Sequence, residues 1–408
     1  MTARTVAEKI LSEHARRGLR AGDIALCSVD LLMASDTTAP ISIRSFEEMG
    51  GRRVVNPQNV VFVMDHAAPA PTQQVANLHS LMRRFSAEHG IALFDVGEGV
   101  CHQLVVENRY VRPWSLILGA DSHTCTYGAL GALACGVGST DLAGAMFTGK
   151  AWFRVPETIR VNLTGAFPPR VYAKDLALHL VGRLGANGAT YMSIEFYGEP
   201  LEAICLADKL TICNMMAETG AKTAVVCDSQ TGVASDEAAE VHSVLNVDLS
   251  EIEPCAAVPH SVDSVVPVSR LTGTTVNQGF LGSCTNGRIE DIRVAAGILR
   301  GRKIPPGVRM FVVPASRGVL LQAIREGLVE TLSEAGATFV VPGCASCVGT
   351  HNGVPGDGEN VISSTNRNFK GRMGNNKAFI YLASPATVAA SVVNGKITDP
   401  RDFGEEVK

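Results

Sequence analysis

Short apolar runs that end in polar residues alternate along this chain with amphipathic stretches. Four runs rich in β-branched residues lie at 59–66, 115–124, 223–229 and 307–316. Helical periodicity covers 173–185 and 318–336. Strand–helix alternation of this kind predicts an α/β fold, in which mostly parallel sheets are covered by helices.

Breaks in this pattern predict the domain organisation. A chain of 408 residues is long enough for two or three domains of about 150 residues each. The segment 251–270 has spaced prolines and little periodicity, which indicates a linker, and a weaker break lies near Pro156. We therefore expect α/β domains at 1–155, 156–265 and 266–408.

Composition and charge narrow the classes of function. Hydrophobic residues make up 46% of the chain, and the formal net charge is −4 without a Lys/Arg run. A surface that tracks nucleic acid needs clustered basic residues, so we predict no nucleic-acid partner. No stretch reaches the roughly 18 apolar residues of a membrane span, and the N-terminus lacks a signal-peptide core. We expect a cytoplasmic protein with no membrane partner.

Three of the eleven cysteines form a pattern that suggests a metal centre. Cys344 and Cys347 form a CxxC flanked by glycines, and Cys284 lies between a strand-like run and a helical one. Three thiolate ligands suit zinc or iron–sulfur and leave one coordination position open for substrate. Two alternatives remain. One is three buried thiols, and the other is a thiol–disulfide oxidoreductase, which would need a CxxC that opens a helix.

Polar side chains follow several predicted strands, at the edge where parallel sheets bind ligands. The candidate catalytic residues are Asp65, His66, His102, Asp121, His123 and Glu195. Imidazoles oriented by carboxylates serve acid–base catalysis, and the apolar setting of Glu195 would raise its pKa. A satisfied core histidine and a strand-edge charge are the corresponding structural alternatives.

Two arginines near the CxxC suggest an anionic substrate. Arg367 and Arg372 lie five residues apart in the glycine- and asparagine-rich segment 363–374. A guanidinium binds a carboxylate through two hydrogen bonds, so the pair predicts a substrate with more than one carboxylate. A solvated loop is the alternative for either arginine alone.

Several motifs, in order and spacing, resemble the aconitase superfamily, and most closely the large subunits of the two-chain 3-isopropylmalate dehydratase and homoaconitase group. The motifs are GSCTNGR, PGCASC, STNRNFKGRMG, GADSHTCTYGALGALACGVGSTD and YLASPATVAAS. The resemblance covers nearly the whole chain. It departs from single-chain aconitases at Pro40, as the two-chain group does, and from many relatives at Ala345–Ser346.

The resemblance implies three-layered aconitase-like domains around a cluster cleft, without the swivelling fourth domain. It implies a [4Fe–4S] cluster on Cys284, Cys344 and Cys347, whose fourth iron would act on the substrate hydroxyl as a Lewis acid.

The resemblance also implies roles for the remaining candidates. Asp65 and His66 would protonate the departing hydroxyl. The other polar candidates would surround that hydroxyl or the same iron, and Asn366 would neighbour the cluster. Arg367 and Arg372 would bind substrate carboxylates.

The base that removes the carbon-bound proton is, in this family, a serine on the fourth domain. No such segment follows Lys408, so we expect a separate small subunit as partner. The predicted function is a hydro-lyase acting on a 2-hydroxy di- or tricarboxylic acid, with 3-isopropylmalate or homoaconitate favoured. Hydratases of methyl-substituted malate or maleate, an RNA-binding regulator that has lost the cluster, and a zinc scaffold are the alternatives.

Overall fold

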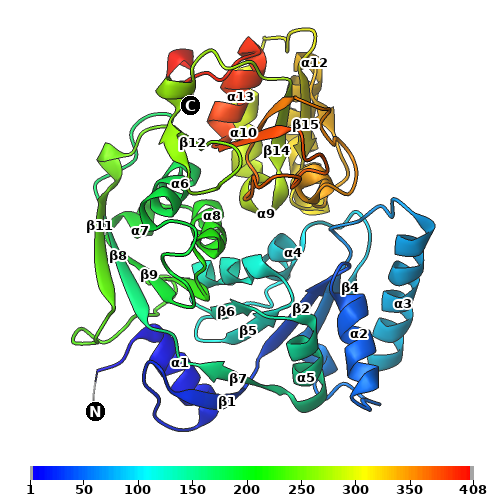
Figure 1. The fold of residues 1–408 in the computed structure, drawn as a ribbon, viewed down its shortest axis with the longest axis vertical. Helices are drawn as coiled ribbons and strands as arrows, with labels where there is room; N and C mark the ends of the chain where they lie inside the picture. Colours follow the sequence, from blue (N-terminus) through cyan, green and yellow to red (C-terminus); the bar gives the residue numbers. More distant parts are fainter. Residues whose placement is uncertain (1–2, 405–408) are drawn as a thin grey trace.

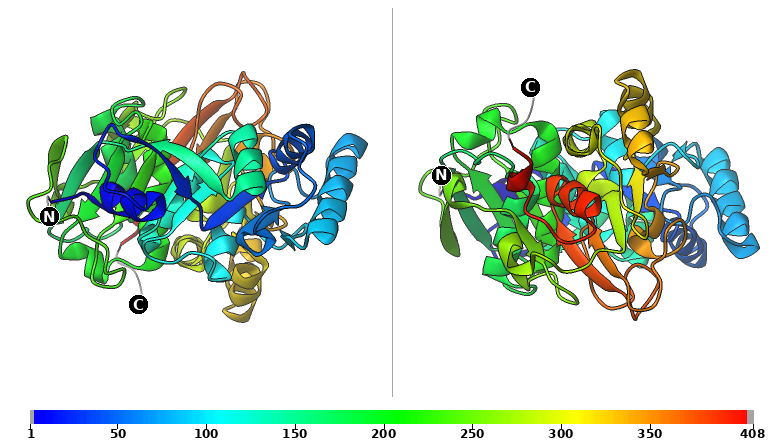
Figure 2. Two further views of the ribbon diagram at one scale, coloured as in Figure 1. Left: turned by 90° about the horizontal axis from the view of Figure 1, so that it is seen from below. Right: turned by 90° about the horizontal axis from the view of Figure 1, so that it is seen from above.

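The structure is a computed structural model that describes residues 3–404, and their strands form four sheets. Three of the sheets are largely or wholly parallel and are covered by helices, as Figure 1 shows. The long helix α3 (Gln73–His89) and the strands β8 (Thr158–Thr164) and β11 (Ser243–Asp248) lie at opposite ends of the molecule (Figures 1 and 2). The predicted α/β class is confirmed.

The first sheet has five parallel strands in the order β4-β3-β2-β5-β6. Its strands are β2 (Leu31–Ser35), β3 (Val60–Val63), β4 (Ala92–Phe94), β5 (Leu116–Gly119) and β6 (Leu133–Gly136). Its further helices are α2 (Ala39–Glu48), α4 (Cys101–Glu107), α5 (Ser139–Thr148) and the 3-10 helix η2 (Ser122–Leu130). Every residue of β2, β3 and β5 is buried, as expected for strands covered on both faces.

A helix and a small antiparallel sheet precede and flank this unit. Helix α1 (Val6–Ala15) begins with a capping box, in which Thr5 Oγ1 accepts from Glu8 N (3.3 Å) and the Glu8 carboxylate accepts from Thr5 N (3.0 Å). Strands β1 (Ile24–Ser28) and β7 (Lys150–Arg154) form the antiparallel pair.

The second sheet has four parallel strands in the order β10-β9-β8-β11. Strands β9 (Ser193–Tyr197) and β10 (Thr223–Val226) join β8 and β11. Its helices are α6 (Ala173–Leu184), α7 (Pro200–Ala203), α8 (Leu206–Met215) and η3 (Met216–Thr219). The helix predicted over 173–185 is therefore confirmed.

The third sheet has seven strands in the order β13-β12-β18-β17-β14-β15-β16. They are β12 (Cys255–Ala257), β13 (Val265–Pro267), β14 (Gln278–Gly282), β15 (Arg309–Val313), β16 (Thr338–Phe339), β17 (Asn360–Ser363) and β18 (Phe379–Ala383). Its helices are α9 (Ser283–Asn286), α10 (Ile289–Leu299), α11 (Arg317–Arg325), α12 (Leu328–Ala335) and α13 (Pro385–Asn394). Strand β12 is antiparallel to both of its neighbours, and the other pairs are parallel.

Two details of the third sheet differ from the sequence pattern. Residues 251–270, expected as a linker, contribute β12 and β13 to the sheet. The stretch 318–336 forms two helices rather than one, because Gly327 adopts a left-handed conformation (φ 70°) between them.

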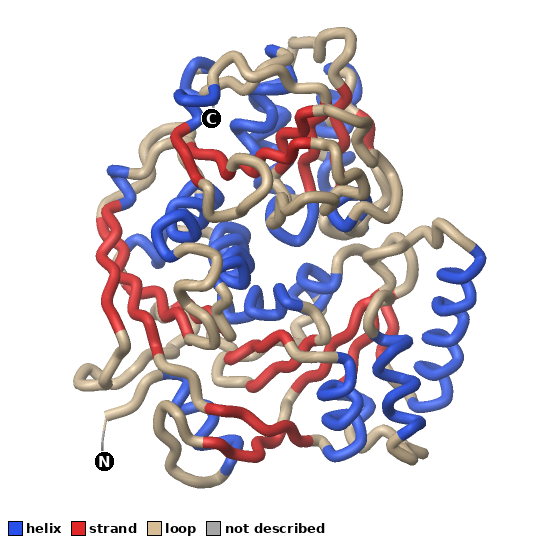
Figure 3. The backbone as a smooth tube through the Cα atoms, viewed as in Figure 1, coloured by secondary structure: helices blue, strands red, loops and turns tan. Residues whose placement is uncertain are grey.

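Backbone hydrogen bonds join the first and third sheets where their loops gather (Figure 3). Val100 N donates to Ala315 O (2.8 Å), and Cys344 N donates to Asp65 O (2.8 Å). The loops that follow strands of the two sheets are thus fixed relative to each other. Within the described part of the chain, no helix combines the length and the apolar character needed to cross a bilayer.

Gly128 lies where η2 packs closely against β10. A Cβ atom on Gly128 would lie 1.6 Å from the carbonyl oxygen of Ala224, so G128A must move η2 off the sheet. We expect a loss of about 1–3 kcal/mol of stability, the usual cost of overpacking. Urea unfolding followed by circular dichroism measures it.

Gly144, inside α5, provides the matched control. An added Cβ there meets no atom within 4 Å, so G144A is expected to be neutral or to stabilise by up to about 1 kcal/mol. Equal unfolding midpoints for the two variants would contradict this account of η2.

Candidate active site

One small cavity, with room for about one water molecule, lies between the first and third sheets and brings together most of the predicted site residues. All three cysteines of interest line it. Its lining residues are Asp65, His66, Val100, Cys101, His102, Asp121, His123, Ser283, Cys284, Cys344, Cys347, Val348, Asn366 and Arg372. Segments more than 300 positions apart in the sequence, such as those of Asp65 and Arg372, therefore meet at one cavity.

Tight turns place the thiols. Cys284 lies in the short helix α9 directly after β14. Cys344 immediately precedes the 3-10 turn η6 (Ala345–Val348), and Cys347 is the third residue of that turn. Ser283 (φ 75°) and Ala345 (φ 50°), each next to one of the cysteines, adopt left-handed conformations that non-glycine residues seldom occupy. Backbone strain of this kind concentrates at functional sites.

Amide and guanidinium groups surround the sulfur atoms. Asn214 and Asn366 each direct an Nδ2–H to Cys284 Sγ, at 3.3 and 3.5 Å. Arg372 Nη2 lies 3.9 Å from Cys347 Sγ. Burial raises the pKa of the Cys284 thiol to about 11, so a bound cation is needed to keep it as a thiolate.

Asp65 and His66 follow β3 and form a tightly oriented pair. His66 donates from Nδ1 to Asp65 Oδ1 (2.7 Å), while Asp65 Oδ2 accepts from Cys101 N (2.7 Å). The buried Asp36 carboxylate accepts from His66 N (2.8 Å) and from His79 Nε2 (3.0 Å). The pair is thereby fixed in position through both its backbone and its side chains.

The Asp121 carboxylate is surrounded by three imidazoles. Its Oδ1 accepts from His102 Nε2 (2.9 Å), and its Oδ2 lies 3.3 Å from His66 Nε2. His123 Nδ1 lies 3.5 Å from Oδ1, and His123 N donates to the same atom (2.8 Å). Burial would raise the pKa of Asp121, but His102 and the other imidazoles outweigh it and hold that pKa well below its ordinary range.

The surroundings of His66 favour the charged form of its imidazole. Burial works against the charge, but negative charge on Cys344 and the carboxylates of Asp65 and Asp121 raise the pKa of His66 well above its ordinary value. Both ring nitrogens face carboxylates, so a proton at each is satisfied.

Glu218 is not among the predicted site residues, yet it pairs with two of them, His123 and Arg367. Its Oε1 lies 2.8 Å from His123 Nε2, and Arg367 Nε donates to its two oxygens at 2.9 and 3.0 Å. Glu218 lies in η3, after a helix rather than after a strand. The rule that polar residues at strand ends form the site could not select it.

Glu195 lies elsewhere, which corrects its assignment to the site. Its carboxylate accepts from Val6 N (3.0 Å), Tyr197 OH (2.7 Å) and Ser235 Oγ (2.6 Å). Those contacts join β9 to the start of α1, away from the thiols. The expectation of a raised pKa does agree with the structure, because burial raises the pKa of Glu195.

The two arginines differ in their surroundings. Arg372 lines the cavity, and its buried Nε has no hydrogen-bond partner among residues 3–404. Arg367 is bound by Glu218 and donates from Nη2 to Ser122 Oγ (2.8 Å). Arg372 therefore has an unsatisfied buried donor, whereas Nε and Nη2 of Arg367 are already bound within the protein.

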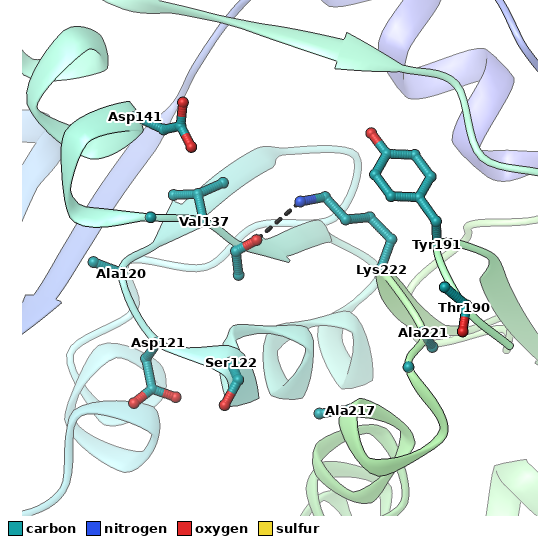
Figure 4. Close-up of a pocket in the computed structure, with 13 residues that line it drawn as sticks. Ala120, Asp121, Ser122, Val137, Asp141, Thr190, Tyr191, Ala217, Ala221 and Lys222 are labelled. Atoms are coloured by element: carbon teal, nitrogen blue, oxygen red, sulfur yellow. Dashed lines mark hydrogen bonds between the residues drawn. The ribbon is translucent and has the colours of Figure 1, made fainter. Parts of the chain in front are cut away.

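A second, wider hollow shares a wall with this site. Asp121 and Ser122 line it together with Tyr191 and Lys222, as Figure 4 shows. Lys222 Nζ donates to Gly136 O (2.9 Å). Asp121 therefore lines both this hollow and the cavity that contains the cysteines.

The fold and the site together define the class of protein. The structure resembles the crystal structure of holo aconitase X from Thermococcus kodakaraensis with a TM-score of 0.54 at 13% identity, over 89% of this chain and 88% of that one. That likeness shows an aconitase-like fold. The model of the aconitase family (aconitate hydratase) matches residues 8–233 and 226–395, and the chain belongs to that family.

Curated relatives match nearly the full chain. It is 45% identical to the 3-isopropylmalate dehydratase large subunit of Elusimicrobium minutum, over 98% of this chain and 99% of that protein. It is 48% identical to 3-isopropylmalate dehydratase large subunit 1 of Methanopyrus kandleri, with the same coverage. It is also 48% identical to the probable methanogen homoaconitase large subunit of Methanosarcina mazei, over 92% and 99%.

The Glu218 contacts lead to a prediction about acid sensitivity. Burial would raise the pKa of Glu218, but hydrogen bonding to His123 and the charge of Arg367 lower it below its ordinary value of 4.5. A lowered pKa contributes stability above pH 4.5 that disappears as the pH falls through the folded-state pKa. E218Q should therefore be less stable than wild type by about 3 kcal/mol at pH 7, and the difference should shrink below pH 4.5.

Unfolding midpoints in urea at pH 7, 5 and 4 test this. E237Q, which changes an exposed glutamate, is the control and should stay within about 0.5 kcal/mol of wild type at each pH. A gap between E218Q and wild type that is the same at all three pH values would refute the assignment.

Proposed function

We propose that this chain is the large subunit of an iron–sulfur hydro-lyase that removes and adds water on a 2-hydroxy di- or tricarboxylic acid, with 3-isopropylmalate or homoaconitate as substrate. The observation that carries the proposal is the convergence of three cysteines, two Asp–His units and Arg372 on one cavity. The names of the relatives support the same substrate class. The eleven free cysteines are in keeping with a cytoplasmic enzyme.

The cysteine site fits a [4Fe–4S] cluster. Its donors are thiols only, they are buried, and amide groups of Asn214 and Asn366 point at one of the sulfurs. Arg372, which lines the same cavity, has a buried Nε without a hydrogen-bond partner among residues 3–404. When bound to Cys284, Cys344 and Cys347, the cluster supplies Lewis-acid chemistry at an iron that lacks a protein thiolate.

The chain's own residues supply the proton that the leaving group needs. Hydroxide is a poor leaving group, so the departing oxygen must be protonated as the carbon–oxygen bond breaks. His66 holds this proton at Nε2, since Asp65 occupies Nδ1 and fixes the ring. In the reverse reaction the same nitrogen takes the proton back from water.

The remaining groups orient the substrate and stabilise charge. Arg372 binds a substrate carboxylate, and Arg367 contributes from its position on Glu218 and Ser122. His102 and His123 keep Asp121 ionised beside His66. We further propose that a small subunit provides the serine that removes the carbon-bound proton.

Metal analysis of the reconstituted chain tests the cluster. We expect about four irons and as much sulfide per chain after anaerobic reconstitution. C347A and C284A should lose most of this iron, because each removes one of three thiolate ligands. C135A, which changes a buried cysteine in β6, is the control and should retain it. One zinc per chain instead of iron would support a zinc scaffold and overturn the proposal.

Mixing experiments test the partner. Without a general base the chain alone should be slower than the mixed pair by about 10²–10⁴-fold. Turnover of a panel of hydroxy acids, including methyl-substituted malates and maleate hydration, identifies the substrate. Comparable rates with and without the small subunit would contradict the proposal, and salt-sensitive RNA retention by the cluster-free chain would favour a regulator.

A further inference from the structure

Lys174 is a buried cation without a carboxylate partner. Its side chain, near the start of α6, is 0% exposed. Its Nζ donates to the carbonyl oxygens of Ser364 (2.9 Å) and Thr365 (2.6 Å) and lies 3.5 Å from Met215 Sδ. Among residues 3–404, no carboxylate forms an ion pair with it. A buried ammonium without a counter-charge costs several kcal/mol, so about this much stabilisation must come from another source.

The adjacent carboxylate, Asp175, forms no ion pair with this ammonium in the described chain and is bound elsewhere. Asp175 accepts from Tyr172 N (3.0 Å) and Cys255 N (3.2 Å), and so serves the start of α6 and the edge of the third sheet. Burial raises the pKa of Asp175 to about 7, which shows how weakly its negative charge is supported.

The favourable charges that act on Lys174 come first from the cysteine site. Burial lowers the pKa of Lys174 to about 8, and negative charge on Cys284 and Cys347, followed by that on Asp291 and Glu218, acts against this by favouring the ammonium form. Lys174 itself lies outside the cavity, behind the loop that follows β17.

Two carbonyl groups connect Lys174 to the cysteine site. Ser364 O also accepts from Thr285 Oγ1 (2.9 Å), and Thr285 directly follows Cys284. Thr365 precedes Asn366, whose Nδ2 is directed to Cys284 Sγ (3.5 Å). The ammonium therefore polarises the two peptide groups that precede Asn366, and Asn366 contacts this sulfur.

We propose that Lys174 supplies the buried positive charge that offsets the cysteine thiolates and raises the reduction potential of the bound cluster. This inference rests on the cluster of the proposed function. The potential of an iron–sulfur cluster rises with positive charge and with hydrogen bonding in its surroundings, and residues beyond the ligands set both. Lys174 contributes the charge directly, and it fixes the loop of Asn366 through two carbonyl oxygens.

Three substitutions of Lys174 separate the effect of its positive charge from the effect of its hydrogen-bond donors. K174M removes both the charge and the donors, K174Q removes the charge but retains an N–H donor, and K174R retains the charge. K209M is the matched control, because Lys209 is also buried, at 2% exposed, but is paired with Asp228 (Nζ–Oδ2 2.6 Å). The reduction potential of the reconstituted cluster is measured by redox titration, followed by its electron paramagnetic resonance signal.

We expect more negative potentials in K174M and K174Q, and values close to wild type in K174R and K209M. Loss of the cluster in both neutral variants but not in K174R would support the same conclusion. Unchanged potentials in K174M and K174Q would overturn it, and so would equal shifts or equal cluster loss in all three Lys174 variants. A wild-type chain that assembles no cluster would count against the proposed function itself, so the two failures are distinguishable.

Discussion

The contacts between one carboxylate and three imidazoles are the interaction on which the site depends. Asp121 follows β5, and it meets His66 from the loop after β3, His102 from α4 and His123 from η2. A carboxylate enclosed in this way would bind a proton unless positive charge or hydrogen-bond donors surround it. The network therefore requires that three separate segments of the first sheet's edge converge, and the parallel arrangement of the strands provides that convergence.

The third sheet contributes a different chemistry to the same point. Its thiols lie on short turns with left-handed residues beside them, and Cys344 N is bound to Asp65 O. The Asp65–His66 pair and the thiol turn are therefore held together by the backbone. A shift of one sheet against the other would separate Asp65 and His66 from the sulfur atoms, so the proposed reaction depends on the hydrogen bonds between the sheets.

The sequence predicts those parts of the fold and the site that produce a recognisable pattern within a short segment of chain. Parallel strands have continuous apolar runs because both faces are covered, and a CxxC between glycines is visible as a motif. No pattern in the neighbouring sequence distinguishes Glu195 from Glu218 as a site residue. Both are buried glutamates, but one contacts the start of α1 and the other contacts His123 and Arg367, 95 and 149 residues away. Only the packing of α8 and η3 against η2 identifies which of them belongs to the site.

Burial of charge also explains why the two substrate arginines differ. Arg367 has its Nε on Glu218 and an Nη2 on Ser122, so the protein itself already balances its charge. Arg372 has a buried Nε without a partner in the described chain, and its Nη2 faces only the polarisable sulfur of Cys347. An anion that enters the cavity gains most from the arginine whose donors are least satisfied, because no existing ion pair has to be broken. For the proposed reaction we therefore expect Arg372 to bind the first substrate carboxylate, and we expect the Glu218–Arg367 pair to hold the second arginine in place until a further carboxylate competes for it.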